Sequence, residues 1–462
     1  MSAQYTLFKF VKHKHIIKRK VKNMNAHFIS FGCKVNQYET ESIKEIFISE
    51  NYDISDTPAD ADVIVINSCT VTSSGDSKTI HTLKRIRKLN PDAVIVLTGC
   101  LPQASPEIAD KLPEADIVTG TKNRNKIPEL VKRHIEKKEQ IIHITSYEKC
   151  DDFENIKCSE FKNKTRAFVK IQDGCNQFCS YCIIPYARGR CRSKPIETLK
   201  EEIKELAANG HKEIVLVGIN LAFYGKEFDL CLADAVEVCC KIKGVERVRL
   251  GSLEPEIITD SDLERLSKLP QFCPHFHLSL QSGCDKTLKN MNRHYNCEQY
   301  YDLVCRIRKY FSNASFTTDI MVGFPDETDK DFEESLKFAE KIGFSKIHVF
   351  PYSVRPGTKA AEMKNQVSEN IKAQRAKIMK SAGSQLTERF MKTQVGMTVP
   401  VLFERESSPE FHQGFTPNYT LIKIPAKKSE KSLRRMIFYV KIVESKKDCC
   451  IGELVKLNLP TV

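Results

Sequence analysis

The sequence lacks any long apolar run. None of its hydrophobic stretches approaches the roughly 20 residues that a membrane-spanning helix needs, although 41% of its 462 residues are hydrophobic. It also lacks a recognisable secretory signal peptide, which argues against a disulfide framework for its 18 cysteines. These absences exclude an integral membrane protein and a disulfide-stapled secreted one. We expect a cytoplasmic protein of two or three globular domains that uses some of its cysteines for metal binding or catalysis.

Acidic residues are missing from the first 26 positions, which carry seven basic ones. Arg and Ser, which are abundant in transit peptides, are scarce here. We interpret this segment as a solvated basic tail, or as residues before a true start at Met24, with organelle targeting as the alternative. The whole chain has a formal net charge of +13, which permits a phosphate-rich partner without requiring one.

Three short β-rich runs in the N-terminal part each end at a cysteine. The runs are His27–Gly32, Val63–Asn67 and Val94–Thr98, with helical patterns over Glu39–Glu50 and Ser77–Leu89 between them. The pattern predicts a parallel α/β domain over residues 25–145. The carboxyl ends of parallel strands meet at one edge, so Cys33, Cys69 and Cys100 should converge on a shared metal cluster. The alternative for each cysteine alone is a packed core position.

Six strand-like runs in the middle of the chain each precede a helix-like segment. They are Ala167–Gln172, Glu213–Gly218, Arg247–Ser252, His275–Gln281, Phe316–Phe324 and Lys346–Tyr352. This repetition predicts a partial or complete β/α barrel over residues 160–385, with its site at the carboxyl ends of the strands.

The segments on either side of this barrel lack its alternation of strand-like and helix-like runs. Lys132–Asn163 is charged and irregular, which is typical of a linker with some local structure. After about Gly383 the pattern changes to short strands, such as Thr398–Glu404 and Met436–Val443. They predict a small β-barrel or sandwich over residues 390–460.

A compact cysteine motif follows the first predicted barrel strand. Cys175, Cys179 and Cys182 have the spacing Cys-x3-Cys-x2-Cys. Three thiolates on a tight loop can hold three irons of a [4Fe–4S] cluster and leave the fourth iron open for another ligand. The Cys-Pro ligand that closes the clusters of two-cluster ferredoxins is missing here. A zinc knuckle without its fourth ligand is the alternative.

This motif resembles the signature of the radical S-adenosylmethionine (radical SAM) superfamily, in which the open iron chelates the amino and carboxylate groups of S-adenosylmethionine. The order of the three predicted domains resembles the methylthiotransferases of that superfamily over about Asn25–Gly452. Further short motifs carry the resemblance: Cys182–Arg190, Val217–Asn220, Leu278–Gly283, Met291–Tyr295, Thr318–Pro325, Val349–Ser353 and Arg355–Thr358.

The sequence around Cys33 distinguishes branches of this family. Phe31–Glu39 reads Phe-Gly-Cys-Lys-Val-Asn-Gln-Tyr-Glu, which resembles the branch acting on threonylcarbamoyl-adenosine at position 37 of tRNA. Gly414–Tyr419 also resembles that branch, whereas Asp326 stands where the family often has Gly. The alternatives are the branches acting on isopentenyl-adenosine 37 of tRNA or on an aspartate of a small ribosomal subunit protein.

The resemblance implies two [4Fe–4S] clusters with divided roles. The cluster on Cys175, Cys179 and Cys182 would reduce S-adenosylmethionine to a 5′-deoxyadenosyl radical, which suits removal of the hydrogen on C2 of adenine. The cluster on the three N-terminal cysteines would carry the sulfur that is methylated and transferred. A reducing electron donor is therefore an expected partner. We expect four polar or aromatic residues to contact S-adenosylmethionine: Tyr181, Asn220, Gln281 and Asp319. Tyr181 could equally be a core aromatic.

The C-terminal segment Leu421–Lys447 carries nine basic residues and two acidic ones, with Phe438 and Tyr439 among them. Phosphate neutralisation with aromatic stacking is how small β-domains hold unpaired RNA. The resemblance implies a TRAM-like domain that binds the anticodon arm of tRNA. The predicted RNA contacts are Lys427, Lys428, Arg434 and Arg435. A basic β-domain that only confers solubility is the alternative, and a non-enzymatic iron–sulfur electron carrier or redox sensor is the rival for the whole chain.

Overall fold

A six-stranded parallel sheet forms the N-terminal part of the chain, which the computed structural model describes over residues 23–405, 408–426 and 431–455. The strands follow in the order β2-β1-β3-β4-β5-β6. They are β1 (Asn25–Ser30), β2 (Asp53–Ile54), β3 (Val63–Ser68), β4 (Val94–Gly99), β5 (Ile117–Thr119) and β6 (Ile141–His143). β3 and β4 are buried along their whole length, as expected for strands covered on both faces. The predicted parallel sheet is confirmed.

Helices cover both faces of this sheet. On one face α1 (Lys34–Ser49) and α4 (Ile127–Lys137) contribute Phe47 and Val131 to a shared core. On the other face α2 (Ser73–Leu89) contributes Leu83. α1 starts five residues before the predicted Glu39, because Cys33 already has the extended backbone of a helix N-cap.

The prediction of a linker over Lys132–Asn163 is partly wrong. Its start belongs to α4, and β6 within it pairs with β5 as a strand of the sheet. The charges of α4 lie on its exposed side, while Ile127, Leu130 and Val131 are buried at helical spacing. A charged composition was therefore a poor guide to irregular structure here.

Two parallel sheets form the centre of the molecule. One has the order β7-β10-β11 and the other the order β12-β13-β14-β15. The strands are β7 (Ala167–Lys170), β10 (Glu213–Val217), β11 (Arg247–Leu250), β12 (Ser252–Leu253), β13 (His275–Leu278), β14 (Ser315–Val322) and β15 (Lys346–Pro351). Among the described strands β7 and β15 end the series without pairing to each other, so the β/α barrel is partial. The short strands β8 (Gln172–Asp173) and β9 (Arg192–Ser193) pair separately.

The barrel strands share one large core with the helices around them. The helices of this part are α5 (Ile184–Arg188), α6 (Ile196–Ala208), α7 (Leu232–Cys240), α8 (Asp260–Ser267), α9 (Asp285–Asn290), α10 (Cys297–Tyr310), α11 (Asp329–Ile342), α12 (Lys359–Glu362) and α13 (Glu369–Gln394). α13 continues through Gly383, where the sequence predicted a change to strands. The glycine lets the helix approach β15 closely, since a Cβ there would lie 3.3 Å from the Cβ of Ile347.

The C-terminal strands close into a small antiparallel-rich barrel in the order β16-β17-β18-β20-β19. They are β16 (Thr398–Phe403), β17 (Phe411–Phe415), β18 (Leu421–Pro425), β19 (Ile437–Ser445) and β20 (Cys450–Leu454). Arg247 and Arg249, on β11, donate hydrogen bonds to carbonyl oxygens of Phe415 and Pro417 at 2.8 and 2.9 Å. These contacts fasten the small barrel to the central strands.

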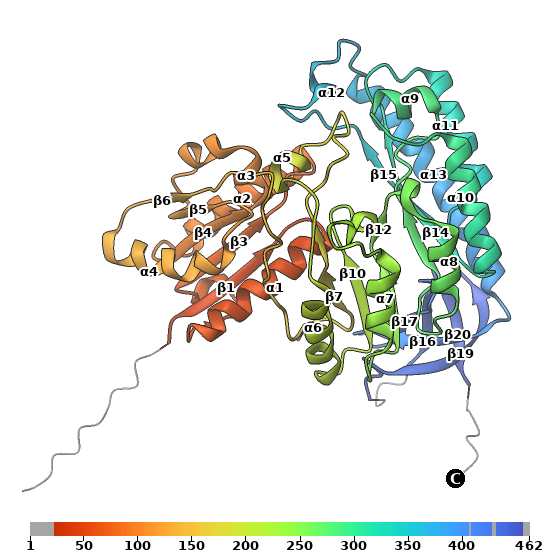
Figure 1. Ribbon diagram of the computed structural model, residues 1–462, viewed down its shortest axis with the longest axis horizontal. Coiled ribbons are helices and arrows are strands. Elements are labelled where there is room, and N and C mark those ends of the chain that lie inside the picture. Colours follow the sequence, from red (N-terminus) through yellow and green to blue (C-terminus); the bar gives the residue numbers. More distant parts are fainter. Residues whose placement is uncertain (1–22, 406–407, 427–430, 456–462) are drawn as a thin grey trace, which may run out of the picture.

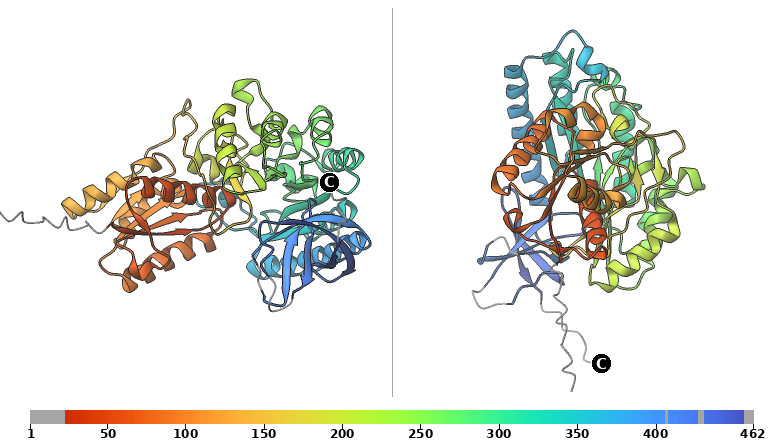
Figure 2. Two further views of the ribbon diagram at one scale, coloured as in Figure 1. Left: turned by 90° about the horizontal axis from the view of Figure 1, so that it is seen from below. Right: turned by 90° about the vertical axis from the view of Figure 1, so that its left-hand side faces the viewer.

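Figure 1 shows the N-terminal sheet beside the partial barrel and the small barrel below it. Figure 2 shows the same arrangement from two other sides. None of the helices in the described ranges combines the length and the apolar character that a membrane span requires.

Candidate active site

The three N-terminal cysteines lie at one edge of the sheet, as predicted. Cys33 caps α1 after β1, Cys69 follows β3, and Cys100 begins α3 (Cys100–Ala104) after β4. A Cβ at Gly32 would come within 2.6 Å of the Cys69 Sγ, so this glycine allows the first loop to lie against the second cysteine. Cys33 is exposed, whereas Cys69 and Cys100 are buried.

Arg188 reaches this edge from the central part of the chain. Its Nε donates to the Sγ of Cys100 at 3.3 Å, and its Nη2 donates to Oδ1 of Asn36 at 2.8 Å. The thiol of Cys33 also donates to Oδ1 of Asn36, at 3.5 Å. Burial raises the pKa of Cys100 to about 12, and the guanidinium of Arg188 opposes that rise. Arg188 therefore donates directly to the sulfur of Cys100 and holds the amide oxygen that accepts from Cys33.

The same guanidinium belongs to a buried charge cluster between the N-terminal sheet and the barrel. Arg188 lies 2.7 Å from Glu39, on α1, and 3.2 Å from Asp173. Lys170, on β7, lies 2.9 Å from Glu39 and 3.2 Å from Asp173. Although burial alone would raise it, the pKa of Glu39 is held far below its usual range by Arg124, Arg188 and Lys170. The two parts of the molecule are joined by paired, fully buried charges.

The cysteines of the Cys-x3-Cys-x2-Cys motif lie on the loop between β8 and α5. Burial raises the pKa of all three thiols, to about 12 for Cys175. Two donors point at them: Asn220 Nδ2 lies 3.7 Å from the Sγ of Cys175, and Arg293 Nη1 lies 3.2 Å from the Sγ of Cys179. The Oδ1 of Asn220 is buried without a hydrogen-bond partner among the described residues.

Both sets of residues fit an iron–sulfur cluster. Thiolates are the ligands that such clusters prefer, and hydrogen-bond donors against the ligand sulfur atoms are a common outer shell. Burial raises the thiol pKa of Cys69 and Cys100 as well as of the three motif cysteines, so a metal must displace their protons as it binds.

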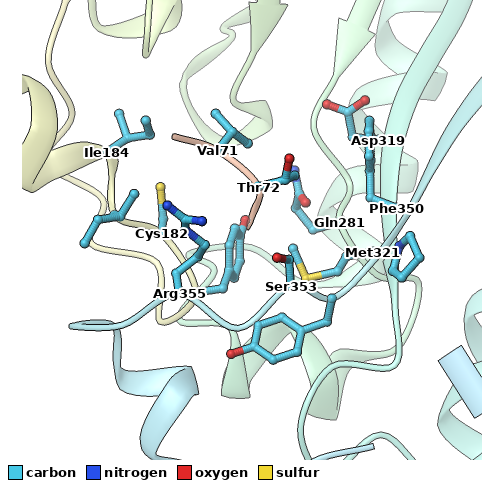
Figure 3. Close-up of a pocket in the computed structure, with 14 residues that line it drawn as sticks. Val71, Thr72, Cys182, Ile184, Gln281, Asp319, Met321, Phe350, Ser353 and Arg355 are labelled. Carbon is cyan, nitrogen blue, oxygen red and sulfur yellow. The ribbon is translucent and has the colours of Figure 1, made fainter. Parts of the chain in front are cut away.

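A cavity of about 200 Å³ opens beside the second set (Figure 3). Its wall includes Thr72, which follows Cys69 by three residues, and Cys182 of the second motif. Strand-end residues complete it. Its other lining residues include Tyr181, Gln281, Asp319, Phe350 and Arg355.

The four residues predicted to contact S-adenosylmethionine divide into two groups. Tyr181, Gln281 and Asp319 line this cavity, whereas Asn220 does not and lies beside Cys175 instead. Tyr181 also packs edge-on against Phe324 at 6.4 Å, so it is both a packed aromatic and a wall of the cavity. Gln281 has a left-handed backbone with φ 65°, a costly conformation that is common at ligand sites.

Arg355, in the central part of the chain, contacts residues of the N-terminal part beside the cavity. Its guanidinium lies 2.6 Å from Asp76, on α2, and donates to the hydroxyl of Thr70. Sequence reasoning placed Arg188, Arg293 and Arg355 in motifs of the family but gave none of them a site role. Their partners lie far away along the chain, so the spacing of residues could not have indicated the contacts.

Two of the predicted RNA contacts on the small barrel, Arg434 and Arg435, form hydrogen bonds within the protein. Arg435 donates to the carbonyl oxygens of Phe161 and Lys164 at 3.0 and 3.1 Å, and Arg434 donates to that of Lys162 at 3.0 Å. These side chains anchor the barrel to the segment before β7, which occupies donors that a phosphate would need. Lys427 and Lys428 lie outside the described residues. Positions 1–22 of the basic N-terminal segment also lie outside them.

Comparison with known proteins gives a consistent result. Residues 169–339 match the radical SAM superfamily, and residues 25–120 match the uncharacterized protein family UPF0004. The threonylcarbamoyladenosine tRNA methylthiotransferase MtaB of Bacillus subtilis is 37% identical, over 90% of this chain and 93% of its own length. A tRNA-2-methylthio-N(6)-dimethylallyladenosine synthase of Finegoldia magna is 33% identical, over 92% of this chain and 94% of its own.

A solved structure shares the fold. The radical S-adenosylmethionine methyltransferase TsrM of Kitasatospora setae superposes with a TM-score of 0.55 at 12% sequence identity, covering 74% of this chain and 77% of its own. At that identity the likeness concerns the fold alone.

Proposed function

This chain belongs to the radical SAM methylthiotransferase family, and from that premise we propose that it attaches a methylthio group to C2 of N6-threonylcarbamoyladenosine at position 37 of tRNA. The observation that carries the proposal is one cavity lined by Cys182 of the barrel motif and by Val71 and Thr72, which follow Cys69 of the N-terminal triad. A single substrate base in that cavity could be served by both triads. The cytoplasm is the compartment where such a tRNA would be met.

The substrate is supported by the similarity to named relatives. Besides the Bacillus subtilis protein, a threonylcarbamoyladenosine tRNA methylthiotransferase of Thermotoga maritima is 39% identical over 81% of this chain. The Phe31–Glu39 motif points the same way. The similarity to dimethylallyladenosine synthases makes dimethylallyladenosine at position 37 of tRNA the leading alternative substrate. An aspartate of a small ribosomal subunit protein is the second alternative.

We assign the ligands of two [4Fe–4S] clusters as follows. Cys175, Cys179 and Cys182 would hold one, at which S-adenosylmethionine would bind. Cys33, Cys69 and Cys100 hold the second. When bound, the clusters and S-adenosylmethionine would supply the radical chemistry that removes the C2 hydrogen and the sulfur that is methylated and transferred.

The protein's own side chains orient these ligands and shape the cavity. Arg188 fixes Cys100, and Arg293 fixes Cys179, each by a hydrogen bond to sulfur. Tyr181, Gln281 and Asp319 offer one aromatic and two polar surfaces to S-adenosylmethionine. Arg355 holds the N-terminal domain against the barrel, so the two triads keep a fixed separation.

The small barrel is the proposed contact for the anticodon arm. Phe438 and Tyr439, on β19, are 39% and 43% exposed, which is unusual for aromatic side chains that serve only a core. Lys441 and Lys447 nearby are exposed as well. An external reductant would supply the electrons.

Mass spectrometry of tRNA nucleosides tests the proposal in cells. Cells that lose the gene should lose 2-methylthio-N6-threonylcarbamoyladenosine and accumulate the unmethylthiolated nucleoside. Loss of the 2-methylthio form of dimethylallyladenosine instead would establish the alternative substrate.

A further inference from the structure

A second cavity adjoins the first across the short helix α5. It has a volume of about 320 Å³, and the lining residues that bear on its role are Tyr147, Lys149, Tyr186 and Arg190. Ile184 of α5 lines the first cavity, whereas Tyr186 of the same helix lines the second. Residues two apart in an α-helix project from nearly opposite sides, so one helix separates two neighbouring cavities. Figure 1 shows α5 beside α3, against which it packs.

Tyr186 lines the second cavity with a ring that solvent reaches, since the residue is 56% exposed. The ring of Phe178 packs edge-on against it at a centroid distance of 5.9 Å. The guanidinium of Arg190 in turn lies over the Phe178 ring, at 4.7 Å. Phe178 has a left-handed backbone with φ 49°, which is uncommon for a bulky residue. An exposed aromatic ring that is supported in this way suits the stacking of a nucleobase.

Tyr147 forms a fixed wall of the same cavity. Its ring lies so close to Gly189 that a Cβ at position 189 would come within 2.6 Å of the Tyr147 Cγ. Its hydroxyl is hydrogen-bonded to the hydroxyl of Thr121 at 2.8 Å and accepts from Nη2 of Arg192 at 3.2 Å. The cavity is therefore formed before any ligand enters, which lowers the cost of binding.

The charge of the lining suits a phosphate. Two cations, Lys149 and Arg190, and one carboxylate, Glu148, line the cavity, and all three residues are exposed. Neither cation has a carboxylate within 4 Å among the residues that the structure describes. Basic side chains that are not already paired can neutralise the phosphates of a nucleic acid.

We propose that the second cavity binds a nucleotide of the anticodon loop next to position 37, with its base stacked on Tyr186 and its phosphate beside Lys149 and Arg190. This inference rests on the proposed function. A base that enters the first cavity must leave the stack of its own strand, so its neighbour loses a stacking partner. The ring on the other side of α5 replaces that partner, as aromatic side chains do for splayed-out bases of RNA loops.

Stem–loops that lack one base test this stacking. The RNA is an anticodon stem–loop with N6-threonylcarbamoyladenosine at position 37, either intact or abasic at position 36 or at position 38. Its dissociation constant from the reconstituted full-length enzyme is measured without oxygen by fluorescence anisotropy. Tyr186→Ala should weaken binding of the intact RNA about 5- to 150-fold, the range for one base on an aromatic ring, whereas Tyr186→Phe should preserve it. One of the abasic RNAs should bind wild-type and Tyr186→Ala enzyme equally.

Two results would overturn the proposal. One is wild-type affinity of Tyr186→Ala for the intact RNA, and the other is a loss by the same factor with all three RNAs, which a folding defect would produce. Phe228→Ala is the matched control, because Phe228 is 44% exposed and lines neither cavity. Methylthiolation of the intact RNA by wild-type enzyme is measured separately, and its absence would contradict the proposed function rather than the second cavity.

The phosphate contact has its own measurement. Lys149→Gln should reduce the slope of log K against log salt by roughly one unit, as for one lost phosphate contact. Lys330→Gln changes an exposed lysine on α11 and should leave the slope as in the wild type. A slope in Lys149→Gln equal to that of this control would remove the phosphate from the proposed site.

Discussion

Arg188 donates a hydrogen bond from Nε to the Sγ of Cys100 at 3.3 Å. The arginine follows the cysteine motif of the barrel, and the cysteine begins α3 directly after β4 of the N-terminal sheet. The contact thus joins the segment after the barrel motif to one cysteine of the N-terminal triad. Because both residues are buried, its loss should affect folding as well as chemistry.

Replacing Arg188 with Ala should destabilise the protein markedly. Glu39 and Asp173 would lose a buried partner, and breaking a buried pair costs about 3–5 kcal/mol. Anaerobic chemical denaturation measures the free energy of unfolding. Lys44→Ala, which removes a partly exposed ion pair, should cost no more than about 1 kcal/mol. Equal stability of the two variants would show that the buried charge cluster contributes little.

The ligand assignment predicts the iron content. Anaerobically reconstituted protein should bind about eight irons, as expected for two clusters of four. The triple variant Cys175→Ala, Cys179→Ala, Cys182→Ala should bind about half as much. The matched control replaces three other buried cysteines, Cys239, Cys273 and Cys450, with Ala and should retain the full load. A full iron load in the motif variant would contradict the assignment.

The two triads should also separate in function. A variant with Ala at positions 33, 69 and 100 should still form 5′-deoxyadenosine from S-adenosylmethionine under reductant, because the second motif remains. It should form no methylthio product, since its proposed sulfur-carrying cluster is gone. Both products are measured in the same reaction by liquid chromatography. A loss of 5′-deoxyadenosine as complete as in the motif variant would refute this division.

Much of this organisation could be predicted from the sequence. Short β-branched runs indicated the strands, and the cysteine after each of three runs indicated the shared edge, because both signals are local. The contact of Arg188 with Cys100 joins positions 88 residues apart, and nothing local marks it. The same holds for α13, where Gly383 looks like a boundary until its packing against Ile347 is seen.

For Arg435, on the small barrel, the structure predicts a structural role, whereas the composition of the segment predicted an RNA contact. Arg435 is held by backbone carbonyl oxygens, so Arg435→Ala should lower the thermal stability of the protein as its main effect. A thermal shift assay measures this. An unchanged midpoint together with weakened tRNA binding would instead mean that the arginine contacts RNA.

Exposed lysines of the small barrel should carry the phosphate contacts. The double variant Lys441→Ala, Lys447→Ala should weaken tRNA binding and reduce the slope of log K against log salt by roughly two units, about one for each contact. Lys330→Ala, Lys337→Ala on α11 removes the same charge from another exposed surface and is the control. Equal slopes for the two double variants would place the RNA contact elsewhere.

The most direct test of the central claim is a reaction with purified components. Reconstituted enzyme, S-adenosylmethionine and a low-potential reductant are incubated without oxygen with a stem–loop carrying N6-threonylcarbamoyladenosine at position 37, and its nucleosides are analysed by mass spectrometry. We predict that the base gains a methylthio group at C2 while 5′-deoxyadenosine accumulates. Recovery of the base unchanged from enzyme that holds both clusters and cleaves S-adenosylmethionine would contradict the account.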